Sequence, residues 1–331
     1  MPVLKNIYRY PIKGLSAQPL LRIGLQAKKP FPHDRVFALV RPGAPFDISH
    51  PRWGKKGLFV MLMLEEALAR VRTTLNVETL QLTIAQDNHQ LIVADLNDEA
   101  ARARVEEIFW QLIPTLRSAP TLVRSRDGHF MDKPDNVISL INLATVRSLE
   151  QQWGIQIDPL RFRANLYIDG AAPWEEFDWV GSDIRIGEGL FRVDRRNGRC
   201  GATNVNPETG RRDLDLPGSL RAAFGHKEFG VYLAAKEDGS VSVGDSVFTP
   251  APPGAGHVAR PLPAIRRASR QQFMCGGCYF IYEQSAGIPD QSIAPGTPFA
   301  AIPAHWRCPD CGTEKSTFRP YVEPTRSQTA I

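Results

Sequence analysis

The sequence is poor in cysteine and has no long apolar run. Only five cysteines occur among 331 residues, which argues against a disulfide framework. The longest apolar run is the seven-residue stretch 58–64, whereas a helix that spans a membrane needs roughly 20 residues. The first residues show no apolar segment followed by small residues, so we expect no secretory signal. These deficits favour a reducing, cytoplasmic setting and no membrane partner.

The sequence has only a small excess of positive over negative charge. The net charge is +5, with 43% hydrophobic and 23% charged residues, which is ordinary for globular domains. Residues 250–272 hold four arginines and no acidic residue, so one short segment carries most of the excess. This concentration argues against a nucleic-acid-binding surface. The same segment holds five prolines, which predicts a semi-stiff linker.

Several common catalytic motifs are missing as well. The seven histidines show no paired metal-ligand spacing. The sequence also has no glycine-rich phosphate loop and no Gly-x-Ser-x-Gly elbow around a nucleophile. The chemistry must therefore come from other residues, and the cysteines are the strongest candidates.

Short alternating segments dominate residues 1–249 and predict a mostly β region. Strands are expected near 3–10, 35–41, 78–84, 90–95, 165–169, 183–194 and 229–248. The Asp238-Gly239 pair predicts that the last of these is a hairpin. Helices are expected near 98–112, 143–153 and 218–224, the last two ending at glycines. Strands around Cys200 favour a β-barrel or a sandwich.

Four of the five cysteines form two Cys-x-x-Cys pairs, separated by 29 residues. Four thiolates in this arrangement predict a tetrahedral metal site. Such a closed site has no open position for a substrate, so it can pass electrons but cannot transform a molecule. The segment is rich in aromatic residues, which together with a metal can stabilise a domain too small for a large aliphatic core.

Residues 273–318 resemble a rubredoxin. The matching features are the cysteine pairs, Tyr282, the segment from Pro295 to Phe299, the segment from Ile302 to Trp306, the segment from Arg307 to Gly312, and Phe318. The resemblance implies one iron bound by Cys275, Cys278, Cys308 and Cys311, and a role in one-electron transfer. Tyr279 stands where rubredoxins usually have glycine, so we expect the amides around the sulfurs to be arranged differently. A module held together by zinc is the alternative.

The fifth cysteine, Cys200, lies among arginines in the stretch from Arg195 to Thr203. Nearby cations lower the pKa of a thiol and favour the thiolate, which is both a nucleophile and a soft metal ligand. A lone cysteine is also often a small buried hydrophobe. The local sequence leaves both interpretations open.

Residues 1–249 resemble the MOSC family in its form with an N-terminal β-rich domain, which includes the amidoxime-reducing component. The matching segments are Tyr10–Lys13, Asp34–Phe37, Arg161–Asn165, Arg199-Cys200, Pro207–Gly210, Phe229–Tyr232 and Val243–Asp245. The resemblance implies that Cys200 supplies the protein sulfur to molybdenum. It also implies that the pterin cofactor is held by Lys13, Arg35, Arg163, Asn165 and Arg199.

Basic and forked donors suit the phosphate of such a cofactor. The alternative for each basic residue is a solvated position at a strand edge. Two positions depart from the family pattern. Ala164 replaces a frequent proline, and Gly14 follows Lys13 where relatives often have serine.

The predicted fold is α+β and mostly β: a MOSC-type β-barrel with an N-terminal β-rich α/β domain, plus a small rubredoxin-like iron domain. The expected boundaries are 1–120 for the N-terminal domain, 121–249 for the MOSC domain, 250–272 for the linker, 273–320 for the rubredoxin-like domain and 321–331 for a flexible tail.

The resemblances imply a molybdenum-dependent oxidoreductase that reduces N-hydroxylated or N-oxide-type small molecules. Its electrons would pass through its own iron site, which implies a reductase as electron donor. Two alternatives stay open. One is a sulfur carrier that uses a Cys200 persulfide, and the other is a non-catalytic module for electron transfer or binding.

Overall fold

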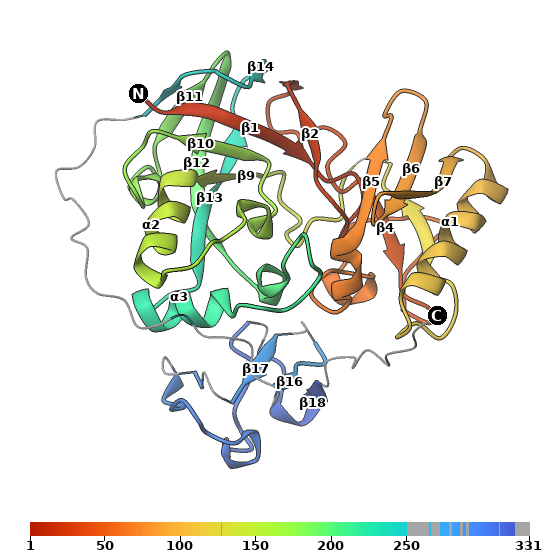
Figure 1. Cartoon of the computed structure of the whole chain (residues 1–331), viewed down its shortest axis with the longest axis vertical. Helices are drawn as coiled ribbons and strands as arrows, with labels where there is room; N and C mark the ends of the chain where they lie inside the picture. Colours follow the sequence, from red (N-terminus) through yellow and green to blue (C-terminus); the bar gives the residue numbers. More distant parts are fainter. Residues whose placement is uncertain are drawn as a thin grey trace.

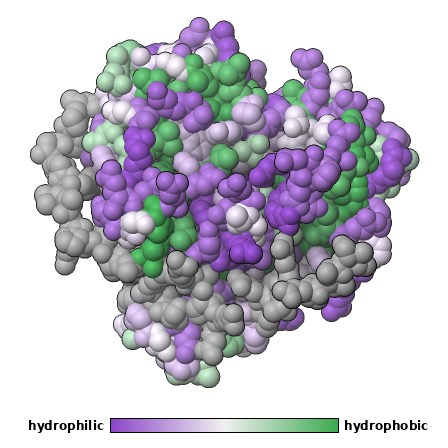
Figure 2. All heavy atoms as spheres, viewed as in Figure 1, coloured by the Kyte–Doolittle hydropathy of each residue, from purple (hydrophilic) through white to green (hydrophobic). Residues whose placement is uncertain are grey.

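The computed structural model of the chain describes residues 1–126, 128–249, 265, 272–277, 280–284, 287–288, 291–310 and 312–321. Apart from residues 265, 272 and 321, the predicted linker and tail lie outside these ranges. No helix within the described ranges is long and apolar enough to cross a lipid bilayer. On the face in Figure 2, hydrophilic side chains cover most of the surface and apolar ones gather in separate patches.

A curled eight-stranded sheet forms the largest part of the molecule (Figure 1). In spatial order its strands are β15 (Val247–Phe248), β11 (Asp183–Ile186), β12 (Gly189–Gly198), β13 (Glu228–Ala235), β9 (Ile138–Asn142), β10 (Leu166–Asp169), β1 (Val3–Arg9) and β2 (Gln18–Leu20). Neighbours are antiparallel except for the parallel pair β9 and β10. Backbone hydrogen bonds between residues 244–247 and residues 2–4 bring the β15 end back onto the start of β1. In place of a full barrel, the structure has one curled sheet that forms a half-barrel.

Two helices cover the core of this sheet. α2 (Leu143–Trp153) begins at Asn142, whose side chain accepts a hydrogen bond from an amide of the first turn. α3 (Leu216–Phe224) begins at Asp215 in the same way. Both helices end at glycines with positive φ, Gly154 at 64° and Gly225 at 76°, a conformation in which a side chain is unfavourable. The sequence-based predictions of these two helices are confirmed.

A second part of the molecule contains smaller sheets and α1 (Glu99–Leu112). One sheet has the order β5 (Val71–Leu75), β6 (Gln81–Gln86), β7 (His89–Asp95), and another pairs β4 (Phe37–Val40) with β8 (Thr121–Arg124). The carboxylate of Asp98 caps α1. Val105 and Phe109 of α1 pack into an aliphatic core with Leu82 and Ile84 of β6. The predicted helix near 98–112 is confirmed.

The C-terminal domain is a three-stranded sheet with 3₁₀ turns, and it lies against the large part below α3 in Figure 1. Its strand order is β17 (Ile281–Glu283), β16 (Gln272–Met274), β18 (Arg319–Tyr321). Short 3₁₀ helices along the whole chain span Lys56–Leu58, Glu66–Arg70, Pro159–Phe162, Glu175–Phe177, Gly201–Asn204, Phe299–Ala301 and Lys315–Thr317.

The hairpin predicted at Asp238-Gly239 is wrong. β13 pairs with β12 and β9, whereas β14 (Gly239–Ser242) pairs with β3 (Arg22–Leu25). The segment after β3 binds the end of β13, where the hairpin prediction places the strand that follows residue 239. The amide of Lys28 donates to the carbonyl of Ala235 at 2.9 Å, and the amide of Ala27 donates to the carboxylate of Asp238 at 2.7 Å. The predicted strand 183–194 is also two strands, β11 and β12, which turn at Gly187 with φ of 53°.

Candidate functional site

Cys200 lies where β12 has ended and the 3₁₀ helix Gly201–Asn204 begins. It is the N-cap of that helix, with an extended backbone. Its carbonyl accepts hydrogen bonds from the amide of Thr203 at 3.0 Å and from the hydroxyl of Thr203 at 2.9 Å. The side chain is partly exposed. The backbone therefore holds the sulfur at a fixed point and leaves it accessible.

A cavity with an empty volume of about 820 Å³ opens beside Cys200. Its described lining has one acidic residue, Asp132, and six cationic residues: Lys13, Arg35, Lys56, Arg161, Arg163 and Arg199. Among the described residues, carboxylates pair with Lys13, Arg35 and Arg161 through Asp132, Asp34 and Asp213, respectively. Positive charge therefore exceeds negative charge around the cavity, which favours an anionic ligand.

Lys13 is buried in the wall of this cavity. Its Nζ donates to the carbonyl of Phe130 at 2.8 Å and to Asp132 at 2.5 Å. Burial lowers the pKa of Lys13, and Asp132 opposes that effect. Burial also disfavours the charge on Asp132, but Lys13 and Lys56 outweigh it and hold the pKa of Asp132 below its usual range. The side chain of Asp132 is 51% exposed because it faces the open cavity.

The residue after Lys13 has no room for a side chain. Gly14 has φ of 84°, and a Cβ built there would lie 3.1 Å from Cα of Met61 and 3.2 Å from the carbonyl oxygen of Val60. A serine at this position would have to move the backbone of residues 60–62. The departure from the family pattern at Gly14 thus has a local steric reason in this chain.

Arg35 and Arg163 lie on the ring of one tyrosine. Their guanidinium carbons are 4.4 Å and 4.6 Å from the ring centre of Tyr10. Arg35 donates to the carbonyl of Arg163 at 2.9 Å, and Arg163 donates to the carbonyl of Leu15 at 2.7 Å. Both arginines have φ of 50°, a strained region for side-chain-bearing residues that costs about 1–3 kcal/mol each and is often found at functional sites.

Burial lowers the pKa of Arg163, and the nearby charge of Arg35 adds to this effect. Two like charges held this close in a buried wall are stabilised by an anion between or beside them. Of the two, Arg35 is paired with the carboxylate of Asp34.

Arg199 and Asn165 use their polar atoms within the protein. Arg199 lines the cavity, but its Nε donates to the carbonyl of Phe229 and its Nη1 to that of Phe162, both at 2.8 Å. Asn165 is fully buried and does not line the cavity. Its Oδ1 accepts from the hydroxyl of Ser139 at 3.0 Å, and its Nδ2 donates to the carbonyl of Tyr8 at 3.2 Å. Asn165 therefore ties β9 and β1 together behind the cavity.

The structure thus brings Lys13, Arg35, Arg163, Arg199 and Cys200 around one cavity and places Asn165 outside it. Sequence reasoning missed several lining residues: Lys56, Met61, Met63, Met131, Asp132 and Tyr232. Arg161 was part of a matched motif but had no predicted role. Five of these residues lie outside the matched motifs, so no local pattern marked them. Tyr232 is the exception: it lies on β13 at the end of the matched segment Phe229–Tyr232, and it had no predicted role.

Only half of the predicted iron ligands fall in the described part of the chain. Cys275 and Cys308 are buried, 0% and 3% exposed, whereas Cys278, Tyr279 and Cys311 lie outside the described residues. The amide of Gly277 donates to Sγ of Cys275 at 3.3 Å, the kind of hydrogen bond that stabilises a metal-bound thiolate. A Cβ at Gly276 would lie 2.7 Å from the carbonyl oxygen of Thr317, so this turn requires glycine.

Comparison with known proteins finds two family models in the chain. The MOSC domain model matches residues 127–248, and the rubredoxin model matches residues 272–318. The molybdenum cofactor sulfurase of Drosophila mojavensis is 38% identical over 96 residues, which are 29% of this chain and 12% of the sulfurase. The chain thus spans about an eighth of the length of that relative.

A probable rubredoxin of Methanothermobacter thermautotrophicus is 40% identical over 53 residues, which are 16% of this chain and 84% of the rubredoxin. Among solved structures, YiiM from Geobacillus stearothermophilus matches with a TM-score of 0.28 and 18% identity, over 34% of this chain and 54% of YiiM. A TM-score this low adds no weight to a functional assignment.

Proposed function

Because the chain contains a rubredoxin domain over residues 272–318 and matches the MOSC domain model over residues 127–248, we propose that it is a molybdenum-cofactor-dependent oxidoreductase. One observation carries the proposal: the cationic cavity lined by Lys13, Arg35 and Arg163 opens directly beside Cys200. Cationic, forked donors suit the phosphate of a pterin cofactor, and a thiolate is a soft ligand suited to its metal.

The residues present fit the cofactor. Arg35 and Arg163 would hold its phosphate, and Lys13 would add a third positive charge near Arg35. Cys200 would ligate the metal. When bound, molybdenum would supply two-electron chemistry on an oxygen atom of the substrate, while the protein supplies orientation and charge.

The remaining residues keep this site in order. Arg199 and Thr203 fix the backbone on both sides of Cys200 through their hydrogen bonds. Asp132 stays ionised at neutral pH because its pKa is held low, so its role is to orient Lys13 and not to donate a proton. We propose that the substrates are small N-hydroxylated compounds or N-oxides.

The C-terminal domain would bind one iron through Cys275, Cys278, Cys308 and Cys311 and return electrons one at a time. The buried sulfurs of Cys275 and Cys308 and the amide hydrogen bond to Cys275 support this role. A closed four-thiolate site suits electron transfer. A separate reductase would then supply the electrons to the iron.

The similarity to molybdenum cofactor sulfurases favours a second candidate. In that case Cys200 would carry sulfur as a persulfide, and the cations around the cavity would stabilise its negative charge. Such a carrier has no evident use for a rubredoxin domain, so this candidate explains less of the chain.

Metal analysis separates the candidates. We would purify the protein from cells that make the pterin cofactor, measure molybdenum and iron, and record visible and EPR spectra. The proposed function requires both metals, together with oxidation of the reduced protein by hydroxylamines, amidoximes or N-oxides. Iron without molybdenum, with sulfane sulfur on Cys200, would favour the sulfur carrier, and iron with neither would favour a non-catalytic module.

A further inference from the structure

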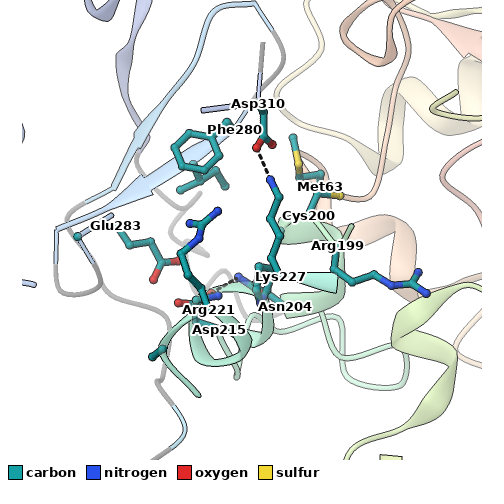
Figure 3. A pocket seen from close by; sticks show the side chains of 16 residues that line it. Met63, Arg199, Cys200, Asn204, Asp215, Arg221, Lys227, Phe280, Glu283 and Asp310 are labelled. Carbon is teal, nitrogen blue, oxygen red and sulfur yellow. Dashed lines mark hydrogen bonds and ion pairs between the residues drawn. The ribbon is translucent and has the colours of Figure 1, made fainter. Parts of the chain in front are cut away.

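The cysteine-bearing end of the C-terminal domain faces Cys200. A groove with an empty volume of about 660 Å³ lies between them, with Cys200 and Lys227 on one side and Phe280 and Asp310 on the other (Figure 3). Asp310 lies inside the second Cys-x-x-Cys pair, and Phe280 follows the first pair by two positions. The C-terminal domain thus presents its predicted metal site, and not a distant face, to the cavity.

An ion pair between Lys227 and Asp310 joins the two sides (Figure 3). The two side chains are only 24% and 19% exposed, so the pair is better shielded from water than an ordinary surface ion pair. The backbone carbonyl of Lys227 accepts from the amide of Arg199 at 2.9 Å. Lys227 is therefore one hydrogen bond away from the residue that precedes Cys200, and Asp310 directly precedes Cys311.

Sulfur-containing side chains form another part of the contact. Cys200 and Met274 both pack against a cluster formed by Met61, Met63 and Leu64. Met274 belongs to the C-terminal domain and directly precedes Cys275. The methionine side chain is flexible and polarizable. The two domains can therefore pack here without a rigid fit, so the C-terminal domain can dock and leave more than once. Figure 3 shows Met63 next to Cys200 at the edge of the groove.

We propose that the C-terminal domain docks on the rim of the Cys200 cavity through the Lys227–Asp310 ion pair, and that single electrons cross this contact by way of Met274 and the Met63 cluster. The electron acceptor in this inference rests on the proposed function, whereas the docking contact does not. The docked domain also covers the groove side of Cys200, whose side chain remains partly exposed.

Each transfer moves one electron and nothing else. Iron held by the four cysteines would give up the electron, and the metal held by Cys200 would accept it. No bond forms or breaks, and no proton moves. Two transfers therefore return the two electrons that one substrate molecule removes.

Alkylation of Cys200 measures docking without the molybdenum cofactor. In iron-loaded, cofactor-free protein, Lys227→Glu and Asp310→Lys should each raise the rate of iodoacetamide labelling at Cys200 several-fold, because like charges then face each other. Mass spectrometry of the Cys200 peptide gives this rate. The exchanged pair, Lys227→Asp with Asp310→Lys, should restore slow labelling.

Lys236→Glu is the matched control. Lys227 and Lys236 flank opposite ends of β13, and Lys236 pairs with Asp183, which lies on β11 of the large sheet. The control changes the net charge by the same amount and should leave labelling of Cys200 unchanged. Unchanged labelling in both Lys227→Glu and Asp310→Lys, or no recovery in the exchanged pair, would overturn the docking contact.

Electron transfer is then measured in protein that holds both metals. Reoxidation of the iron after mixing with substrate should slow in each single variant and in Met274→Ala, and should recover in the exchanged pair. Turnover with a reduced viologen, which can bypass the iron, should stay unchanged. Normal reoxidation in the single variants would overturn the electron route. Labelling that responds as expected in protein unable to bind molybdenum would uphold the docking contact and overturn the proposed function alone.

Discussion

The large curled-sheet part and the small C-terminal domain are stabilised in different ways. The large part buries a broad core made mostly of aliphatic residues. The C-terminal domain instead buries Tyr282, Phe299, Trp306 and Phe318 around Cys275 and Cys308. A domain this small cannot bury enough aliphatic surface to be stable without help. From this difference we expect the large part to fold without its cofactor, whereas the folding of the C-terminal domain should depend on its metal.

Cys200→Ser should have the largest effect on the large part while leaving the C-terminal domain intact. We expect this variant to lose all substrate reduction and its molybdenum, because the soft thiolate ligand is gone. The visible spectrum of the iron domain should be unchanged, since its ligands are other cysteines. Molybdenum analysis, turnover and absorbance test this together. A variant that keeps full activity would show that Cys200 is only a packing residue.

Removing the C-terminal domain tests whether the large part can work without it. A chain that ends near Pro250 should keep its molybdenum and should still reduce substrate with a reduced viologen as electron donor. Turnover with the natural reductase should fall to background, because the electron relay is missing. Steady-state rates with the two donors provide the measurement. Equal rates of the full and shortened chains with the reductase would rule out the relay.

Glu176 should make the stability of the large part depend on pH. Its side chain is fully buried, and burial raises its pKa to about 7, even though Asn142 and Thr145 donate hydrogen bonds to it. In the unfolded chain the same carboxyl has its ordinary pKa of about 4.5. The folded state therefore binds the proton more tightly, and stability falls as the pH rises from about 4.5 through about 7, by about 3 kcal/mol in all.

Denaturant titrations of the shortened chain at about pH 5 and about pH 8 measure this effect. Glu176→Gln should remove most of the difference between the two pH values, because the amide cannot ionise. The iron domain should show no matching change in the full chain. A Glu176→Gln protein with the parent's pH dependence would assign the effect to other groups.

Within the large part, Arg163→Ala should weaken cofactor binding while changing the stability of the cofactor-free protein little. A charge-assisted hydrogen bond to a phosphate is worth about 1.5–3 kcal/mol, so cofactor affinity should fall about tenfold to a hundredfold. The melting temperature of the cofactor-free protein should change little. Arg147→Ala is the control, since Arg147 is exposed and pairs with Asp169 away from the cavity lining. Equal cofactor occupancy in Arg163→Ala and parent would contradict the role of Arg163.

The ends of the helices were predictable from the sequence because caps act locally. Asp98, Gly154 and Gly225 mark helix boundaries by hydrogen bonds or backbone angles within a few residues. β9 was not predicted, since all five of its residues are buried and it shows no alternation of polar and apolar residues. The pairing of β14 with β3 joins segments more than 200 residues apart, and no local pattern carries such information.

The candidate site shows the same division. Motif residues identified Lys13, Arg35, Arg163 and Cys200 as candidates, and the fold places them around one cavity. Their cofactor contacts stay predictions. Lys56 and Asp132 line the cavity because the fold brings segments distant in the sequence together, so single-sequence patterns could not reveal them. Tyr232 also lines the cavity; it lies in a matched motif but had no predicted role. The docking contact between Lys227 and Asp310 joins two domains and was equally invisible.

The position of β1 has a consequence for how the chain folds during synthesis. β1 pairs with β10, so Val3 and Leu4 must wait for Ile168 and Asp169 to be made. At about 5–20 residues per second, the ribosome needs on the order of ten seconds or more to synthesise this partner. During that time β1 can pair with β2, but Leu4 and Ile7, both fully buried in the finished core, lack the strands and helices that later cover them. The nascent N-terminal segment thus exposes apolar side chains to solvent until β10 has been made.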